Sequence, residues 1–246
     1  MQKITLLAVL VYLSASAFSQ TISFGPKLGM VAGSPVPYSF IPEGAKGAPK
    51  PGRNVGLFVK FDFTENYSLI YEVSMTRKRT TFETPLDSVA YVDRIQHPLF
   101  PEVVFEVETF FNGTAVGCFD NYYLEQSLTH QMRITEKMNG LFGLYTAWLQ
   151  KSNTYAKGIG RVGFSPDIIE QELDYSSKMR QWDYGLKAGI GYEASKHMDI
   201  DLKLSYGFES VFCDSFSMLN YTVNNTFVEL SLNYKFFILR QLNSQI

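Results

Sequence analysis

The histidine and serine side chains of this chain are the groups best suited to act as nucleophiles, proton carriers or metal ligands. The three histidines, His97, His130 and His197, are widely separated and form neither an HExxH motif nor another paired metal-binding pattern. Ser127 stands three residues before His130 in a segment that alternates like a strand, so the two side chains should point to opposite faces. The sequence contains no GxSxG motif and no phosphate-binding loop. We therefore expect a protein that is not an enzyme and that holds no cofactor or metal.

The N-terminus has the pattern of an export signal. A short basic start precedes an apolar run over 4–13, and small residues follow, with Ala17 and Ser19 at the positions that signal peptidase prefers. The pattern predicts a signal peptide at 1–19 and an exported domain at 20–246. A buried N-terminal helix is the alternative.

The chain has two cysteines, Cys118 and Cys213, and neither belongs to a CxxC motif. Export would place them in an oxidising compartment, where a disulfide is chemically possible. Because separation along the chain says nothing about contact in space, a Cys118–Cys213 disulfide and two separate thiols both stay open.

The composition excludes several classes of protein. The 246 residues carry 22 Lys and Arg against 24 Asp and Glu, 46% are hydrophobic, and the aromatic share is 15%. This much apolar surface excludes a disordered chain, and the balanced charge without a basic cluster argues against a nucleic-acid partner. Beyond the first twenty residues no apolar run reaches the roughly 20 residues that a membrane-spanning helix needs.

Seven segments alternate between apolar and polar residues with a period of two, which indicates strands with one apolar and one polar face, and an eighth strand is expected at 141–150, which is apolar on both sides. In one of them Gln126 and His130 share a face with Leu124 and Leu128, so its facing is less certain. The segments are 22–30, 54–63, 67–78, 122–134, 141–150, 182–193, 199–208 and 228–236.

The connections between these segments alternate strictly between short turns and long links. Short turns at one end and long loops at the other are typical of outer-membrane barrels. We therefore predict an all-β fold, an eight-stranded antiparallel up-and-down transmembrane barrel with long extracellular loops and short periplasmic turns. Ten strands are the alternative, if two segments within the links also span. The long links are 32–52, 81–121, 151–181 and 209–225.

A soluble, lipocalin-like ligand-binding barrel would show the same period, but with its apolar face inward. Two features favour the membrane arrangement: glycines concentrate on the polar face, as a narrow lumen requires, and aromatic residues gather at the strand ends on the apolar face. We expect two interfacial girdles and an outer-membrane location. The girdle residues are Phe61, Phe63, Tyr67, Tyr192, Tyr234 and Phe236 near the short turns, and Trp182, Tyr184, Tyr206 and Phe208 near the long links.

If the apolar face meets lipid, the charged residues of the strands point into the lumen. Their charges nearly balance, so ion pairing can offset their desolvation. An eight-stranded barrel has room for such side chains but not for a water-filled channel, so we expect a structural polar core; a proton path or small pore is the alternative. The predicted network consists of Lys27, Lys60, Asp62, Glu72, Glu125, Asp183, Lys187, Glu193, Asp199, Asp201, Lys203, Glu229 and Lys235.

The long links should therefore carry the function. Segment 102–111 reads as a strand and runs into Asn112-Gly113, a type I′ hairpin signal, so we expect the strand at 122–134 to extend above the membrane and to pair with this segment as a hairpin. We expect binding, adhesion or envelope and secretion assembly through the loops. The expected partners are outer-membrane lipid, the barrel-assembly machinery during insertion, and an envelope or surface protein. An outer-membrane enzyme with an active site at the rim is the alternative from another class.

The chain resembles the PorT-like outer-membrane β-barrel proteins of Bacteroidota, the group with an outer membrane protein β-barrel domain. The resemblance spans nearly the whole mature chain and implies an outer-membrane barrel. One segment departs from the family pattern, because Leu124-Glu125-Gln126-Ser127 stands where the family has a Leu-Glu-Ile-Pro-like sequence. The matching stretches begin at Phe24, Gly56, Tyr67, Tyr123, Asp183 and Leu230.

Overall fold

The computed structural model describes residues 21–37, 43–96, 100, 102, 104–214, 216 and 221–240. They form one antiparallel sheet of twelve strands and a single 3-10 turn, η1 (Ser176–Lys178). Within this part of the chain, no helix has the length and hydrophobicity needed to cross a lipid bilayer. The predicted signal peptide lies outside the described residues.

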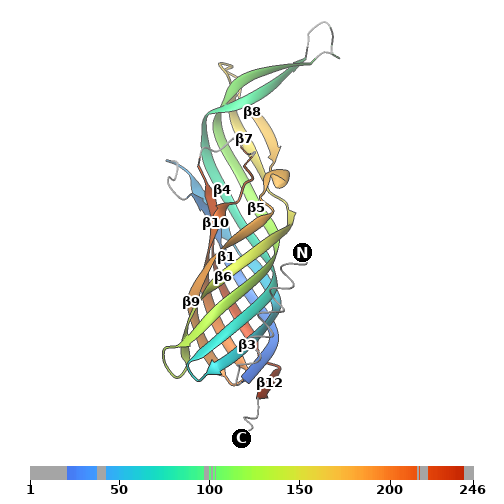
Figure 1. Ribbon diagram of the computed structural model, residues 1–246. Coiled ribbons are helices and arrows are strands. Elements are labelled where there is room, and N and C mark those ends of the chain that lie inside the picture. The colour runs from blue at the N-terminus through green and yellow to red at the C-terminus, as the bar shows by residue number, and fades with distance from the viewer. Residues whose placement is uncertain are drawn as a thin grey trace.

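Eight of the strands close into a ring, as the sequence predicts (Figure 1). Each strand pairs with two neighbours in the order β4, β3, β1, β11, β10, β9, β6, β5, and the pairing of β4 with β5 closes the barrel. The ring strands are β1 (Thr21–Pro37), β3 (Gly52–Thr64), β4 (Tyr67–Gln96), β5 (Val104–Arg133), β6 (Met138–Ser152), β9 (Trp182–Ser195), β10 (Met198–Ser210) and β11 (Val223–Tyr234).

Short turns join the ring strands at one end of the barrel, at residues 65–66, 134–137 and 196–197. In outer-membrane barrels this end faces the periplasm, and we call it the inner end. The long links lie at the opposite, outer end (Figure 1). Past the inner end, β12 (Phe237–Arg240) pairs with the start of β1.

The second and third long links contain strands that continue beyond the ring. β4 and β5 each continue for 30 residues and pair with each other as far as Gln96 and Val104, β7 (Tyr155–Val162) pairs with β5, and β8 (Ile169–Asp174) pairs with β7. We call residues 80–96, 104–120, β7 and β8 the extension; it rises beyond the ring (Figure 1). Beside it, β2 (Lys46–Lys50) pairs with β4 alone.

The predicted turn at Asn112-Gly113 is wrong, because both residues lie inside β5. Gly113 pairs with Leu86 on one side and with Gly160 on the other. A Cβ on Gly113 would lie 2.6 Å from the Cα of Gly160, so the glycine serves close strand approach rather than a turn. The glycines with positive φ in the described ranges are Gly44 and Gly163.

The ring turns its apolar face outward and its polar face inward, the reverse of a soluble ligand-binding barrel. Leu28 on β1 and Leu230 on β11 are among the exposed residues of the wall, whereas Lys27 and Glu229 beside them are buried. The facing of β5 follows the same rule: Glu125 and Ser127 point inward, while Gln126 and His130 lie on the outer side. Polar partners there satisfy the two outward polar groups: Tyr71 donates a 3.0 Å hydrogen bond to Gln126, and Tyr67 lies 2.5 Å from His130 Nδ1.

Candidate functional site

The lumen contains one continuous chain of ion pairs. Four lysines alternate with five carboxylates contributed by six of the eight ring strands, and consecutive charged atoms lie 2.5 to 3.5 Å apart. Each lysine contacts two carboxylates, so the attraction within these ion pairs offsets the desolvation of the buried charges. The order is Asp201, Lys203, Glu72, Lys27, Glu229, Lys187, Glu125, Lys78 and Asp183.

Lys78 is the member of this chain that the predicted network lacks. Its Nζ lies 3.5 Å from Glu125 and 3.4 Å from Asp183, and it stands 5.1 and 5.0 Å from the ring centres of Tyr123 and Tyr145. Lys78 is the last residue of the predicted segment 67–78, so no further alternating residue indicated on which face of the strand it lies. The inward-facing residues of β4 continue past Lys78. Following the period of two beyond residue 78 would have placed Lys78 in the lumen.

Glycines leave room for the carboxylates. A Cβ on Gly207 would lie 2.5 Å from Oδ1 of Asp183, and one on Gly191 would lie 2.8 Å from Oδ1 of Asp201. These inward glycines therefore fill the role that the sequence suggested for a narrow lumen.

The remaining members of the predicted network lie toward the inner end. Lys60 Nζ is 3.6 Å from Asp62 and 3.8 Å from Glu193, and Lys235 is paired with Asp199 at 2.9 Å. All of these except Asp199 line a polar cavity of 820 Å³ at this end. The structure thus divides the thirteen predicted residues into a buried central chain and a group at the inner mouth.

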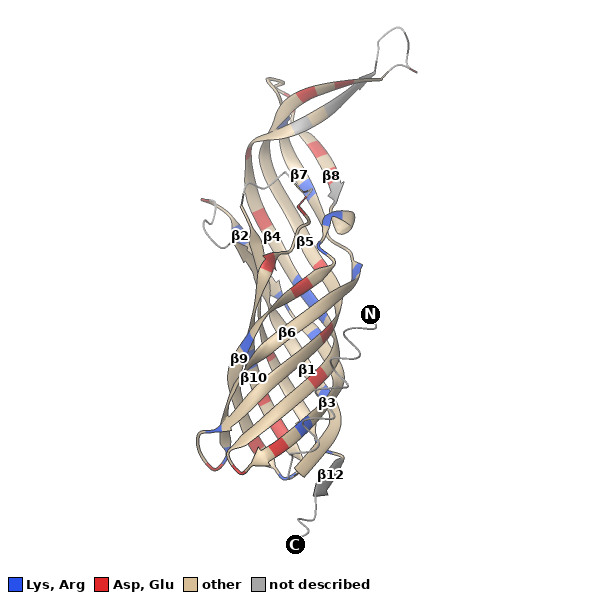
Figure 2. Ribbon diagram, viewed as in Figure 1, with Lys and Arg blue, Asp and Glu red and all other residues tan. Residues whose placement is uncertain are grey.

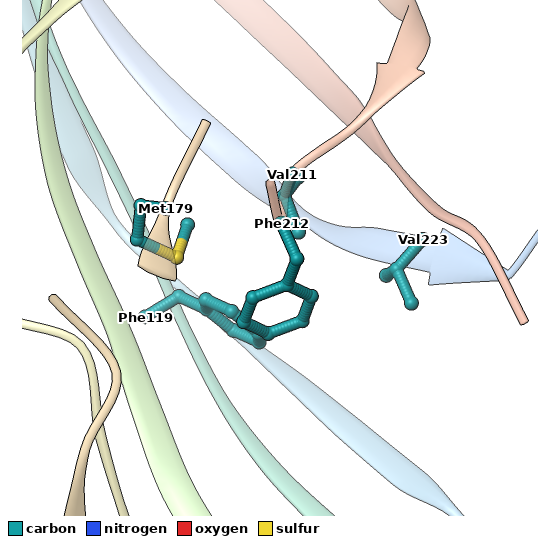
Figure 3. Close-up of a cluster of buried hydrophobic side chains, with 5 residues drawn as sticks. All are labelled: Phe119, Met179, Val211, Phe212 and Val223. Carbon is teal, nitrogen blue, oxygen red and sulfur yellow. The ribbon is translucent and has the colours of Figure 1, made fainter. Parts of the chain in front are cut away.

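Apolar layers flank the central chain. Phe58, Ile70 and Leu141 pack together inside the barrel, and at the outer end Phe119 and Phe212 belong to a second cluster (Figure 3). Loop residues reach over the outer mouth to complete this second cluster, which consists of Phe119, Met179, Val211, Phe212 and Val223. Charged and apolar side chains therefore occupy the lumen between the inner cavity and the outer end.

Nine of the ten predicted girdle residues are exposed or half-buried. Phe61 departs from the prediction: it is only 2% exposed, because it pairs with the apolar Ile22 and Leu69 and packs in a cluster with Leu69. Trp148 is a girdle residue that the prediction omitted; its ring stacks on Trp182 at 5.9 Å. The nine are Phe63, Tyr67, Trp182, Tyr184, Tyr192, Tyr206, Phe208, Tyr234 and Phe236.

The residues considered for catalysis do not come together. Ser127 faces the lumen and bonds to Glu72, while His130 lies on the outer side of the same strand, His197 lies in an inner turn, and His97 is outside the described residues. No group of three or more His, Cys, Asp or Glu side chains suited to a metal ion occurs in the described ranges.

Cys118 and Cys213 are both thiols, so the structure has no disulfide between them and the alternative of two separate thiols describes it. Burial raises the pKa of the Cys118 thiol, which lies on β5 in the extension. Each cysteine belongs to a different part of the outer end: Cys118 to the long strand β5 and Cys213 to the link between β10 and β11.

The extension carries an acidic surface with exposed apolar side chains. Phe105 is 50% exposed and Phe164 is 97% exposed, with its ring set edge-on to Phe110 at 5.3 Å. Apolar patches in water mark sites of interaction. Acidic residues outnumber basic ones here, and Figure 2 shows them along the upper strands. In the extension and the adjoining β7–β8 link, the acidic residues with described side chains are Glu83, Asp87, Glu106, Glu108, Asp120, Asp167, Glu170 and Glu172, and the basic ones are Lys157 and Arg161.

A second cavity, of 300 Å³ and mostly apolar, lies where the extension meets the ring. Its walls come from the end of β1, from β2 and β4, from β5, and from the links before β9 and β11. The extension and this cavity together make the outer end the candidate functional site.

A family model described as "Outer membrane protein beta-barrel domain" matches residues 18–213. The structure is similar to that of Ail, the attachment invasion locus protein of Yersinia pestis, with 14% identity and a TM-score of 0.40 over 89% of this chain and 99% of that one. It is also similar to Neisserial surface protein A (NspA), with 11% identity and a TM-score of 0.38 over 89% and 98%. No curated protein sequence matches the chain significantly.

Proposed function

Because the chain belongs to the outer membrane protein beta-barrel domain family and resides in the outer membrane, we propose that it acts through its extension in binding, adhesion or envelope assembly. In this proposal it is neither an enzyme nor a diffusion channel. The finer assignment to the PorT-like group of Bacteroidota is also a proposal, supported by the resemblance of its strand segments.

The observation that carries the proposal is the exposed tip of the extension. Beyond the pair Val89–Phe111, β4 and β5 form a two-stranded ribbon with no further strand beside it in the described structure, and both of its faces meet the surroundings. Phe105 and Val92 are half exposed there although no lipid is expected so far from the girdles. A partner would cover this apolar surface.

The charge of the tip indicates the chemistry of that partner. Glu106 and Glu108 alternate with Phe105 and Val107 on β5, and Val92 of β4 is paired with Glu108, so glutamates and apolar side chains are mixed along the ribbon. An envelope or surface protein that offers basic and apolar side chains would fit it. Lipid around the ring and the barrel-assembly machinery during insertion are the other expected partners, and nucleic acid is not expected.

Photo-crosslinking in intact cells tests this proposal. A photoreactive amino acid at Phe105 should give discrete protein adducts, whereas the same residue at Leu230 on the wall should give none, because lipid surrounds it. A matched variant replaces residues 90–110 with Asn-Gly between the paired Val89 and Phe111, so that a two-residue turn closes the ribbon. It should insert normally, as judged by heat-modifiable gel mobility, and lose the function of the wild type in adhesion or assembly assays.

Two outcomes would contradict the proposal. If Phe105 gives no protein adduct and the shortened variant behaves as wild type, the tip is not a binding surface. If the purified protein produces stepwise conductance in a planar lipid bilayer, the filled lumen is a pore, and the alternative of a small channel holds instead. N-terminal sequencing of the mature protein tests the signal peptide, with Gln20 as the expected first residue.

A further inference from the structure

We propose that the cavity at the base of the extension is a binding pocket for a small aromatic molecule with one polar group. This inference is independent of the tip and of any partner bound there. It rests on the shape of the cavity, on the side chains that line it and on one buried hydroxyl group.

The cavity exists because large and small residues face each other on the inner side of the extension. Thr84 on β4 pairs with Ala115 on β5, and both line the cavity, so the floor beside the threonine has little side-chain volume. One register step nearer the ring, Phe82 pairs with Gly117, and a Cβ on Gly117 would lie 2.5 Å from the Phe82 ring. The result is a smooth floor bordered by an aromatic wall.

Six aromatic rings line the space, and five of them are in contact with one another. Phe82 and Phe119 lie 4.9 Å apart, Phe119 and Phe212 5.7 Å, and Phe212 is stacked on Phe216 at 4.1 Å. Aromatic rings attract further rings in offset-stacked or edge-on arrangements, so a flat aromatic ligand suits this lining better than a flexible chain. The six rings are Phe82, Phe119, Tyr175, Phe212, Phe216 and Tyr221.

The wall of this apolar space contains a buried hydroxyl group. The Oγ1 atom of Thr84 is fully buried and makes no hydrogen bond within the described structure, although buried hydroxyl groups nearly always have a partner. The surroundings are apolar enough that burial raises the pKa of the lining Tyr175 to about 12. A ligand that carries one hydrogen-bonding group would satisfy the hydroxyl while its ring fills the rest of the pocket.

The cavity is accessible from outside the barrel. Exposed residues of β2 and β4, Lys46, Gly47 and Glu83, border it on one side, and buried residues such as Phe119 and Val223 form its depth. Its volume of 300 Å³ is at the lower end for ligand pockets, which matches a molecule of one or two fused rings. The competing interpretation is an unfilled remnant in the packing of the links above the barrel.

Indole provides a suitable probe, because it is aromatic and has one N–H donor. Its binding to the full-length protein in lipid nanodiscs can be followed by ligand-observed NMR, with empty nanodiscs as the background. We expect saturable binding that Ala115→Phe abolishes by filling the floor of the cavity. The control is Val116→Phe, one residue away on the opposite, exposed face of β5, which should bind indole as the wild type does.

The hydroxyl group is tested with a second pair of probes. Thr84→Val keeps the size of the side chain and removes the hydroxyl, so it should weaken indole binding about 2- to 10-fold, the usual effect of one hydrogen bond. Binding of indene, which has the same shape without the N–H, should not change. This variant decides the question if Ala115→Phe fails to fold.

Three results would overturn the proposal. The first is no saturable binding of indole or indene to the wild type. The second is equal binding to the wild type and to a folded Ala115→Phe variant, which would place the bound molecule elsewhere. The third is a fatty acid such as decanoate that displaces indole and binds more tightly, which would identify an acyl-chain site rather than an aromatic one.

Discussion

Leu230 on the barrel wall and Phe105 on the extension are 52% and 50% exposed, but their surroundings differ. Leu230 belongs to a continuous apolar face between two aromatic girdles, where lipid covers it. Phe105 lies on the two-stranded ribbon, where apolar residues of β5 alternate with glutamates, far beyond the outer girdle. Equal exposure therefore has different meanings: on the wall it reflects solvation by lipid, and on the extension it is the observation behind the proposed binding surface.

The charged residues of the two regions differ in the same way. In the lumen every lysine of the central chain contacts two carboxylates, and burial makes each of these contacts costly to lose. On the extension Glu108 is exposed to solvent, where an isolated charge contributes little to stability. The two regions therefore differ in how much each charge contributes to stability.

The largest expected effect follows from removing one carboxylate of the central chain. Glu72→Ala leaves Lys27 and Lys203 with one partner fewer in a buried site, and we expect a loss of about 3–5 kcal/mol of unfolding free energy. Urea unfolding in detergent, followed by heat-modifiable gel mobility, measures it. Glu108→Ala on the extension is the matched control and should stay within about 0.5 kcal/mol of wild type. Equal effects of the two variants would remove the distinction between the regions.

An arginine substituted at each of the two exposed apolar positions should show which position faces lipid and which faces water. Leu230→Arg puts a charge against the hydrocarbon and should destabilise the barrel by about 2–4 kcal/mol if the residue lies near the bilayer midplane. Phe105→Arg meets water and should leave the unfolding free energy nearly unchanged. The same measurement serves both variants, and a large loss at Phe105 with none at Leu230 would invert the proposed placement.

The smallest effect concerns a thiol. Because burial raises the pKa of Cys118, a smaller fraction of it is thiolate at a given pH, so its reaction with a maleimide should be slower than in the unfolded chain. In a Cys213→Ser background, the rate of maleimide labelling should increase about tenfold for each unit by which the pH is raised, as long as the pH stays below the raised pKa of Cys118. In the wild type, labelling that requires prior reduction would instead reveal a disulfide and contradict the two separate thiols.

The period of two predicted the ring together with the alternation of short turns and long links, and the placement of glycines and aromatic residues decided which face meets lipid. It also identified Lys27 and Glu229 as lumen residues without any knowledge of their contacts. It failed at Asn112-Gly113, where local turn chemistry is overridden by pairing with β4 on one side and β7 on the other. Glycine has two uses in sheets, and the sequence around it does not distinguish a turn from a close strand approach.

The outer cavity could not be predicted for a different reason. Phe82 and Phe212 line it together although 130 residues separate them, and no local pattern relates the two. The inner face of the extension also could not be recognised from the sequence, because small residues such as Ala115 and Gly158 show no hydrophobic periodicity. Sites of this kind depend on which strands become neighbours, and that information lies in the register of the whole sheet.

Spin labels placed along β5 test the central claim most directly, because this one strand runs from the ring into the extension. Labels at Leu128 and Leu124 should be accessible to oxygen and protected from a water-soluble nickel complex, as expected in lipid. Labels at Val116 and Phe105 should show the opposite preference, with the change between 124 and 116. Lipid-like accessibility at Phe105, or water-like accessibility at Leu128 and Leu124, would contradict a membrane-embedded ring that carries a water-exposed extension.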